Sequence, residues 1–148
     1  YFSTKEEIYK AVVQSVLNEI QEVISEAATE GEDVEHLYRE ILLTLSEGIQ
    51  GLSIFFMEQI QLYFPEAWML IEVFSKKVMA NLVRIYEKGM ETRQFKSFSI
   101  SLLTSLDNHF VMSLMTNTEK FEREGMSFDN LVTEYMELRL SGLRAGKD

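Results

Sequence analysis

The residues best suited to metal or acid–base chemistry in this sequence are its two histidines, His36 and His109. Asp33 lies three residues before His36, as in one half of a carboxylate–histidine metal motif, but a di-iron bundle needs a second such pair and the sequence has none. Asp107 lies two residues before His109, so these two side chains do not share a helical face. We therefore predict no metal site, and expect Asp33 to cap a helix and His36 to lie on the surface.

Other kinds of catalytic site have no sequence motif here. The chain contains no cysteine, which excludes disulfides, thiolate metal ligands and cysteine nucleophiles. It has no G-x-S-x-G nucleophile elbow and no glycine-rich phosphate loop, although a serine–histidine–acid triad assembled from distant segments stays open at this level. We predict that the protein is not an enzyme and uses no cofactor.

A dense group of aromatic and methionine residues between Phe55 and Phe74 favours ligand binding instead. Such side chains form the core of most proteins, but some of them can line an apolar cavity, and methionine adapts to ligands of different shapes. Asn81 interrupts an apolar helical pattern and needs a hydrogen-bond partner if it is buried, which a ligand could supply. The candidate pocket residues are Phe55, Phe56, Gln59, Tyr63, Trp68, Met69, Phe74, Asn81, His109 and Phe110.

The overall composition is that of one globular domain. The chain has 148 residues, of which 46% are hydrophobic and 26% charged, and we expect residues 1–148 to form a single domain. The net charge of −10 and the lack of a dense Lys/Arg cluster argue against DNA binding by these residues. No apolar run approaches the ~18–20 residues of a membrane span and no signal peptide is recognisable, so we predict a soluble cytoplasmic protein without membrane partners. Because the chain begins at Tyr1 rather than methionine, we expect it to be a processed or truncated piece.

Helical periodicity runs through nearly the whole chain and predicts an all-α fold of six helices. Only one proline and seven glycines interrupt it. The segment 52–64 is apolar on nearly every side, which is typical of a buried helix, with a strand as the alternative because of its β-branched and aromatic residues. The six predicted helices span about residues 4–29, 34–48, 52–64, 66–88, 97–124 and 127–142.

Local signals predict several of the helix ends. Ser3 and Glu6 form a capping box at the first helix, where Phe2 is placed to act as a hydrophobic staple. Pro65 stands at the start of the fourth helix, which is the position that proline prefers. Gly89 is expected to end that helix.

The last two predicted helices carry apolar residues on more than one side. A terminal helix of a small monomer needs only one buried face, so the second apolar side requires a partner. The simplest partner is a second copy of the chain, forming an intermolecular four-helix bundle about a two-fold axis and burying at least ~1,600 Å². The predicted interface residues are Leu103, Leu106, Phe110, Leu114, Val132, Met136 and Leu140.

Two segments of the chain have distinctive residue orders. Residues 1–8 read YFSTKEEI, an aromatic pair followed by the polar start of a helix. Residues 85–96 read IYEKGMETRQFK, where Gly89 and Phe95 bracket the predicted connection to the next helix. The first resembles the junction that follows the DNA-recognition helix in TetR-type bacterial repressors, and the second resembles the link to their first dimerisation helix. Arg93 stands where that family usually has a second glycine.

Two further segments extend the resemblance over the whole chain. Leu106-Asp107-Asn108 is similar to a Leu-Asp-Gly that the TetR family often has midway along its first dimerisation helix, with Asn108 replacing the glycine. Residues 135–143, YMELRLSGL, are similar to the family's terminal Leu-x-x-Gly-Leu. All four segments occur in the order that the family has.

The resemblance implies an organisation and a function. Residues 1–2 would be the remnant of a missing helix-turn-helix head, and residues 97–143 would be the dimerisation helices of a homodimer. The six helices would form the regulatory body of a transcriptional repressor, in which a small apolar or amphipathic effector tilts the first helix and relieves DNA binding by the missing head. DNA would be contacted only through that head. The alternative is a helical interaction or dimerisation module with no small-molecule ligand; the effector's identity does not follow from the resemblance.

Overall fold

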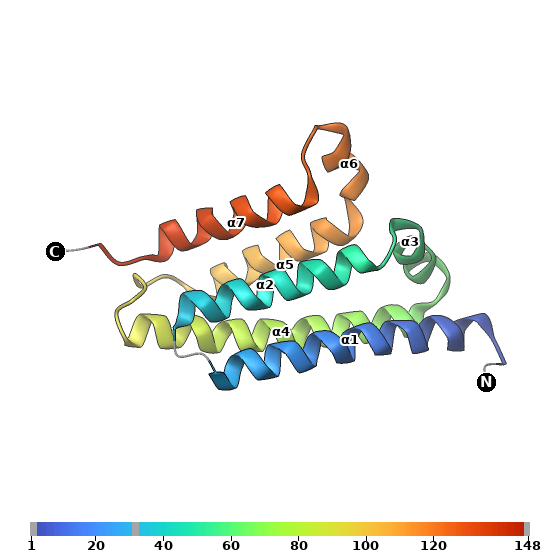
Figure 1. Ribbon diagram of the computed structural model, residues 1–148, viewed down its shortest axis with the longest axis horizontal. Helices are drawn as coiled ribbons and strands as arrows, with labels where there is room; N and C mark the ends of the chain where they lie inside the picture. Colours follow the sequence, from blue (N-terminus) through green and yellow to red (C-terminus); the bar gives the residue numbers. More distant parts are fainter. Residues whose placement is uncertain (1–2, 31–32, 147–148) are drawn as a thin grey trace.

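The computed structural model describes residues 3–30 and 33–146, with the side chains of 26–30, 54 and 118 left aside, and confirms the all-α fold. In this part of the chain there are seven helices and no strand, apart from one antiparallel bridge between Phe95 and Arg144 (Figure 1). The helices are α1 (Lys5–Glu30), α2 (Val34–Gly51), α3 (Ile54–Tyr63), α4 (Pro65–Glu91), α5 (Ile100–Thr116), α6 (Thr118–Arg123) and α7 (Phe128–Leu143).

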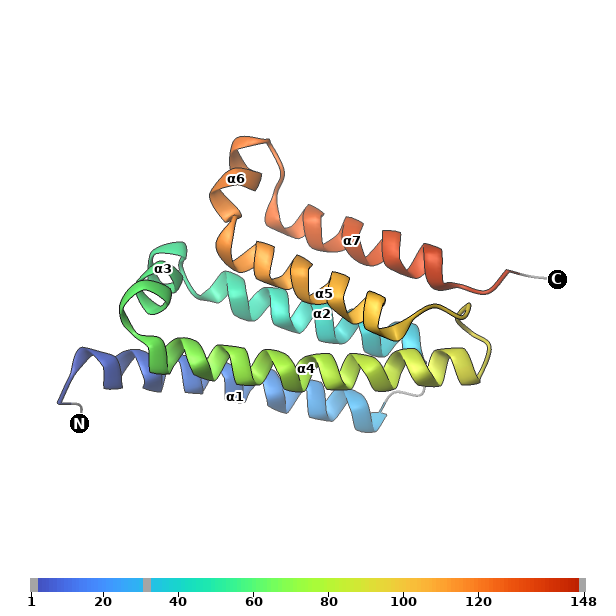
Figure 2. The ribbon, with the colours of Figure 1, turned by 180° about the vertical axis from the view of Figure 1, so that it is seen from behind.

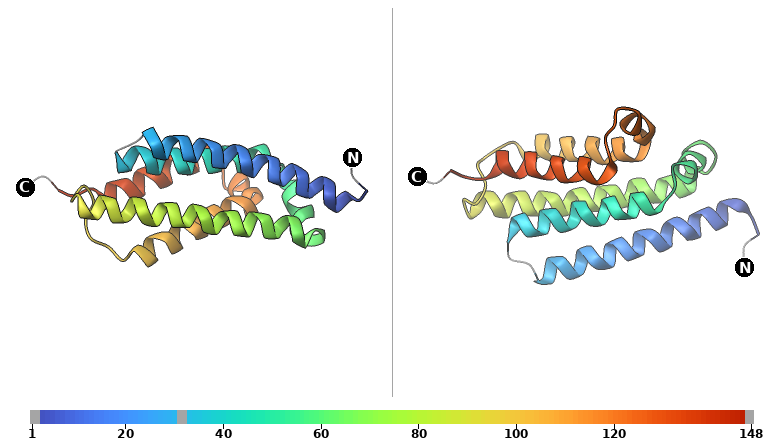
Figure 3. Two further views of the ribbon diagram at one scale, coloured as in Figure 1. Left: turned by 90° about the horizontal axis from the view of Figure 1, so that it is seen from below. Right: turned by 45° about the horizontal axis from the view of Figure 1, so that its top comes forward.

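The two longest helices, α1 and α4, lie side by side, and the other helices pack on them directly or through a neighbouring helix (Figure 3). α2 packs against both of them, α5 packs against α4 and α2, and α7 packs against α2. The short helices α3 and α6 lie at the end of the molecule where α1 begins (Figure 2). Buried apolar side chains from these layers meet in one continuous core.

The predicted helix 97–124 is two helices, which raises the number from six to seven in the described residues. It begins at Ile100, because Ser99 caps it by accepting a hydrogen bond from the N–H of Leu102. It also breaks at Asn117, whose φ of −122° and ψ of 24° are not helical. Asparagine is a weak helix former because its side chain competes for backbone hydrogen bonds, and here it separates α5 from α6.

The first helix is capped one residue later than predicted. Thr4 is the capping residue, since the N–H of Glu7 donates to its hydroxyl at 3.2 Å. The Glu7 carboxylate in turn accepts from the backbone N–H of Ser3 at 2.8 Å. The cap therefore uses Thr4 and Glu7 instead of Ser3 and Glu6, and the carboxylate reaches the N–H of Ser3, the residue before the cap. The predicted staple by Phe2 lies outside the described residues.

Gly89 does not end the fourth helix, because α4 continues to Glu91. The glycine is needed for packing instead: a Cβ at this position would overlap the ring of Phe95, which folds back onto the helix. The N–H of Phe95 also donates to the Gly89 carbonyl at 2.9 Å. The turn itself is made by Arg93, whose φ of 61° is left-handed although it is not a glycine. Such a conformation costs roughly 1–2 kcal/mol, which the surrounding loop contacts offset.

Three other helix starts agree with the sequence. Asp33 caps α2 by accepting from the N–H of Glu35 at 3.1 Å. Pro65 is the first residue of α4. Ser127 caps α7 by accepting from the N–H of Asn130 at 3.2 Å. Each of these signals acts within a few residues, so it needs no tertiary contact.

The segment for which a strand was the alternative is the helix α3, but it is not buried on every side. Met57 and Ile60 face the core, whereas Phe55, Leu62 and Tyr63 are all more than half exposed. The reason is its position, since α3 lies at one end of the bundle, where it packs mainly against α4 and α5 and contacts α1 through the stacked rings of Phe56 and Tyr9. The prediction of a fully buried helix was wrong for this segment.

No single helix in the described ranges is both long enough and apolar enough for a membrane span. α2 and the segment Phe55–Tyr63 reach that composition only when taken together, across a bend of 86°. α2 itself is packed against α1, α4, α5 and α7 within the fold.

Candidate functional site

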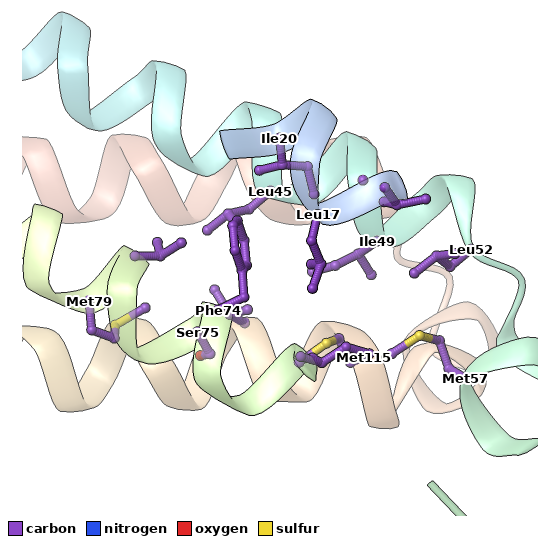
Figure 4. Close-up of a pocket in the computed structure, with 15 residues that line it drawn as sticks. Leu17, Ile20, Leu45, Ile49, Leu52, Met57, Phe74, Ser75, Met79 and Met115 are labelled. Carbon is purple, nitrogen blue, oxygen red and sulfur yellow. The ribbon is translucent and has the colours of Figure 1, made fainter. Parts of the chain in front are cut away.

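A small apolar cavity lies between the first five helices and is partly open to the surface (Figure 4). We call it the inner cavity. Its volume is about 40 Å³, whereas small-molecule sites typically measure roughly 300–1,000 Å³. The lining residues are Val16, Leu17, Ile20, Leu45, Gly48, Ile49, Leu52, Met57, Ile71, Phe74, Ser75, Val78, Met79, Val111 and Met115.

A second pocket of about 220 Å³ adjoins the inner cavity where α3, α5, α6 and α7 meet. The side chains of this end pocket include Glu122 and Phe128, so it reaches the last two helices. The two spaces have four lining residues in common. The shared residues are Ile49, Leu52, Met57 and Met115.

An open groove of about 430 Å³ runs between α1 and α4, and we call it the α1–α4 groove. Its most buried residues, Leu17 and Phe74, also line the inner cavity and therefore form a shared wall. Lys77 and Arg84 are its only charged residues in the described chain. The lining residues are Gln14, Leu17, Asn18, Gln21, Leu70, Val73, Phe74, Lys77, Ala80, Asn81 and Arg84.

The structure brings only two of the ten predicted pocket residues to these spaces. Phe74 lines the inner cavity and the groove, and Asn81 lines the groove. The hydrogen-bond partner that Asn81 needs comes from its own helix, because Arg84 donates to the Asn81 side-chain oxygen at 2.7 Å. A ligand is therefore not required to satisfy this amide.

The other eight residues are dispersed. Phe55, Tyr63 and Met69 are exposed, and His109 is exposed with its Nδ1 2.8 Å from the Ser105 carbonyl oxygen. The half-buried rings of Phe56 and Phe110 stack on Tyr9 and Tyr135, at centroid distances of 4.8 and 3.9 Å. Successive side chains of an α-helix point in different directions around its axis. A dense run of aromatic residues on a helix therefore cannot all face one cavity. The remaining two are half-buried and stand outside the lining of the inner cavity: Gln59 and Trp68.

The two sequence features considered for metal binding lie apart from these spaces. His36 is exposed, and Asp33 accepts from the Gln94 side chain at 2.7 Å in addition to capping α2. Among the side chains that the structure describes, no three His, Asp or Glu residues are grouped so as to hold a metal ion.

The most polar part of the interior is a cluster around Asp107 that sequence reasoning did not predict. Asp107 is fully buried in α5. Its Oδ1 accepts from the hydroxyls of Tyr38 at 3.0 Å and Tyr135 at 2.5 Å, and its Oδ2 accepts from the hydroxyl of Tyr86. Arg139 donates to Oδ1 through Nε at 3.3 Å. This Asp107 cluster joins α2, α4, α5 and α7.

The chemistry of the Asp107 cluster is structural. A carboxylate has about four acceptor positions, and four donors from three other helices converge on this one. Its oxygens are therefore engaged within the protein. Because a buried charge is tolerated only when it is paired and hydrogen-bonded, the cluster specifies how the four helices pack.

A sequence signal for this cluster existed. Leu103, Asp107 and Val111 are spaced by four residues, and all three are buried on one face of α5. A carboxylate in the middle of an apolar helical stripe indicates a buried, partnered acid. The family-like segment 106–108 and the neighbouring His109 indicate nothing about this burial.

The tyrosines of the Asp107 cluster have strongly shifted acidities. Burial, and after it the negative charge of Asp107, raises the pKa of Tyr38, Tyr86 and Tyr135 well above its usual value. The folded protein therefore keeps these protons at a pH where the unfolded chain loses them. The stability that these phenol protons contribute is fully present below about pH 10, the pKa of tyrosine in the unfolded chain. It is lost as the pH rises above that value.

We expect the free energy of unfolding to fall as the pH rises above about 10, with a slope of up to about 1.4 kcal/mol per pH unit for each shifted tyrosine. Urea unfolding between about pH 8 and about pH 11 measures this slope. The Tyr135→Phe variant should have a shallower slope, because one of the three phenols is absent. Identical slopes for the variant and the unmodified chain would contradict the assignment.

The residues predicted for a dimer interface fall into two groups. Five of the seven lie in the core of the single chain, at most 3% exposed, because α5 and α7 use these residues to pack within the monomer. In the single chain their side chains are not exposed for contact with a second copy. These residues are Leu103, Leu114, Val132, Met136 and Leu140.

The other two predicted interface residues lie on an apolar surface that α5 and α7 share. Leu106 is 44% exposed and Phe110 is half-buried. The stacked rings of Phe110 and Tyr135 connect the two helices. We call this surface the outer α5/α7 face, and it consists of Leu102, Leu106, Phe110, Leu131, Tyr135 and Leu138.

Comparison with known proteins gives one relationship. The chain is 19% identical over 107 residues to YvaF of Bacillus subtilis (strain 168), described as an uncharacterized HTH-type transcriptional regulator. The match covers 72% of this chain and 56% of YvaF, so the chain spans little more than half the length of that relative. No protein-family model matches the chain, and no solved structure does.

Proposed function

We propose that this chain is the effector-binding and dimerisation body of a TetR-like transcriptional repressor, whose DNA-binding head precedes Tyr1 in the full protein. The similarity to an HTH-type regulator over 107 residues supports a role in transcription regulation. The four family-like segments in the sequence support the TetR type. In this proposal the chain catalyses no reaction, contacts DNA only through the head and works in the cytoplasm.

The main observation in support of the proposal is the position of α1 in the wall of the inner cavity. Val16, Leu17 and Ile20 of this helix form part of the wall of the inner cavity. α1 also packs closely on α2, since a Cβ at Gly48 would overlap the side chain of Ile20. A ligand that enlarges the inner cavity by pushing on this part of its wall would displace α1, the helix to which the head would be joined.

This arrangement couples two binding events. An effector that prefers the displaced position of α1 changes the spacing of the two heads in a dimer and weakens DNA binding. By linkage, DNA weakens effector binding by the same factor. The effector site comprises the inner cavity and the end pocket, which open into each other when their shared side chains move.

One observation favours a second candidate function. The inner cavity measures only about 40 Å³, so the core of this chain is nearly filled. A well-filled core suits a helical interaction or dimerisation module that works through the outer α5/α7 face without a small ligand. The two candidates differ in whether any small molecule stabilises the chain.

An apolar effector should raise the melting temperature of this chain. A ligand at ~100 times its Kd adds about 2.7 kcal/mol, which corresponds to a rise of about 5–10 °C for a chain of this size. Differential scanning fluorimetry with apolar and amphipathic compounds measures the shift. Val16→Phe should reduce the shift, because the larger ring occupies the inner cavity that half-buried Val16 lines.

The matched control is Val12→Phe. Val12 lies one turn earlier on α1, is 40% exposed and does not line the inner cavity. Its variant should therefore keep the full shift. A broad set of compounds that leaves the melting temperature unchanged would contradict effector binding and favour the interaction module.

A further inference from the structure

The charge of the α1–α4 groove is opposite to that of the rest of the chain. The whole chain has a net charge of −10. The described lining of the groove contains two cations, Lys77 and Arg84, and no carboxylate. The four ion pairs found among the described side chains involve neither of them. Both cations are exposed, and Arg84 donates only to the neutral side chain of Asn81.

The groove also has an apolar part beside these cations. Leu70, Val73 and Ala80 line it on α4, and Val73 is 49% exposed although it is apolar. The amides of Gln14 and Asn18 lie opposite on α1. A site of about 430 Å³ with an apolar part, a few polar groups and two cations matches an elongated molecule with one anionic end.

The groove and the inner cavity share a wall. Leu17 of α1 and Phe74 of α4 line both spaces, and Figure 4 shows them reaching in from their two helices. Both side chains are at least nine-tenths buried. A chain of methylene groups that displaces the Phe74 ring would pass from the groove into the apolar interior. The groove and the inner cavity thus meet at these two side chains.

We propose that the effector is an anionic amphiphile, with its charged head bound by Lys77 and Arg84 in the α1–α4 groove and its apolar tail directed between Leu17 and Phe74 towards the inner cavity. This inference rests on the proposed effector site and names the chemical class of its ligand. The guanidinium of Arg84 and the ammonium of Lys77 donate charge-assisted hydrogen bonds to a carboxylate or phosphate head. A cationic amphiphile would meet two like charges there.

The position of this site gives it a direct mechanical effect. The groove lies between the two longest helices, which lie side by side along the molecule. A tail inserted between Leu17 and Phe74 separates α1 from α4. The head anchors the ligand to α4 alone, because both cations belong to that helix, so α1 is the helix that moves.

Isothermal titration of this chain with decanoate and with its neutral analogue decanamide tests the proposal, in about 0.15 M salt to screen long-range repulsion. We expect decanoate to bind about tenfold more tightly than decanamide. The double variant Lys77→Gln/Arg84→Gln should remove this preference. These substitutions change exposed residues and leave the core intact. Lys76→Gln, the neighbouring exposed lysine outside the groove lining, is the matched control and should keep the preference.

Two further compounds separate the contribution of the charged head to binding from that of the apolar tail. Acetate has the same head without the tail and should bind at least about a hundredfold more weakly than decanoate, since each buried methylene contributes about 0.8 kcal/mol. Decyltrimethylammonium has the tail with the opposite charge and should bind more weakly than decanamide. If acetate bound as tightly as decanoate, the apolar tail would contribute nothing, and the proposal of an amphiphilic effector would be overturned.

The outcomes distinguish this inference from the proposed function. Equal binding of decanoate and decanamide would overturn the anionic class of effector and leave the proposal of an apolar effector intact. The same holds if Lys76→Gln removes the preference for decanoate as fully as the double variant does. If neither compound binds, this inference is overturned, whereas the proposed function is tested separately by the broad set of compounds in the fluorimetry experiment. If the double variant changes the molar mass measured by light scattering without any ligand, the groove is covered by a second copy and the inference is overturned.

Discussion

Replacing Asp107 by leucine should lower the free energy of unfolding by about 3–5 kcal/mol. The substitution leaves the Arg139 guanidinium, only 12% exposed, without its carboxylate. It also removes the acceptor of three tyrosine hydroxyls in the interior, those of Tyr38, Tyr86 and Tyr135. Each buried donor left without an acceptor is costly, because water cannot replace the lost hydrogen bond. Urea unfolding followed by circular dichroism gives the change in free energy.

Two controls isolate the buried pair. Glu137→Leu removes the exposed ion pair with Arg39 and should change stability by less than about 1 kcal/mol. The double variant Asp107→Leu/Arg139→Leu should recover part of the loss of Asp107→Leu, because it no longer buries an unpaired charge. A loss below about 1 kcal/mol for Asp107→Leu would show that the Asp107 cluster does not hold the four helices together.

Replacing Leu106 or Leu138 by aspartate should convert a dimer of this chain into monomers. Leu106 is 44% exposed and Leu138 is 72% exposed, so both side chains are free to contact a second copy across the outer α5/α7 face. A two-fold interface of at least ~1,600 Å² would bury a new, unpaired carboxylate at a cost of several kcal/mol. Light scattering at tens of micromolar measures the molar mass. The variants should keep their helical circular dichroism, because neither residue belongs to the core.

Two further variants make this prediction specific. Val23→Asp changes an apolar residue of α1 that is 42% exposed and lies off the outer α5/α7 face, so it should remain dimeric. Leu140→Asp places the same charge in the monomer core, where Leu140 is fully buried, and should unfold the chain. A stable monomer of the unmodified chain at tens of micromolar would refute the dimer and weaken the TetR-like assignment.

The helices and most of their starts follow from the sequence because their causes are local. Asp33, Pro65 and Ser127 act on backbone groups no more than a few residues away. Apolar spacing identified the long helices for the same reason. The errors at Gly89 and Asn117 concern positions where propensity alone is a weak guide, since Gly89 is retained inside α4 for the ring of Phe95.

The candidate site could be predicted only in part. Phe74 and Asn81 were identified by residue type, and both line spaces beside α4. Aromatic residues such as Phe55 and Tyr63 looked equivalent in the sequence, yet they are exposed. Which residues of a uniformly apolar segment face inward depends on where the neighbouring helices lie, and α3 packs mainly against α4 and α5 at the end of the bundle.

The sequence by itself determined an all-α chain, most of its helices and a broad apolar surface on α5, but it left open which part of that surface faces inward. The predicted stripe contains Leu103, Leu106, Phe110 and Leu114, and Val111 extends the apolar surface beyond it. The structure divides this surface: Leu103, Val111 and Leu114 are buried together with Asp107, whose carboxylate accepts from donors of α2, α4 and α7, whereas Leu106 is exposed. The donors of different helices are separated by tens of residues along the chain, so only the tertiary packing could bring them together. That choice also places the remaining apolar side of α5 at the surface.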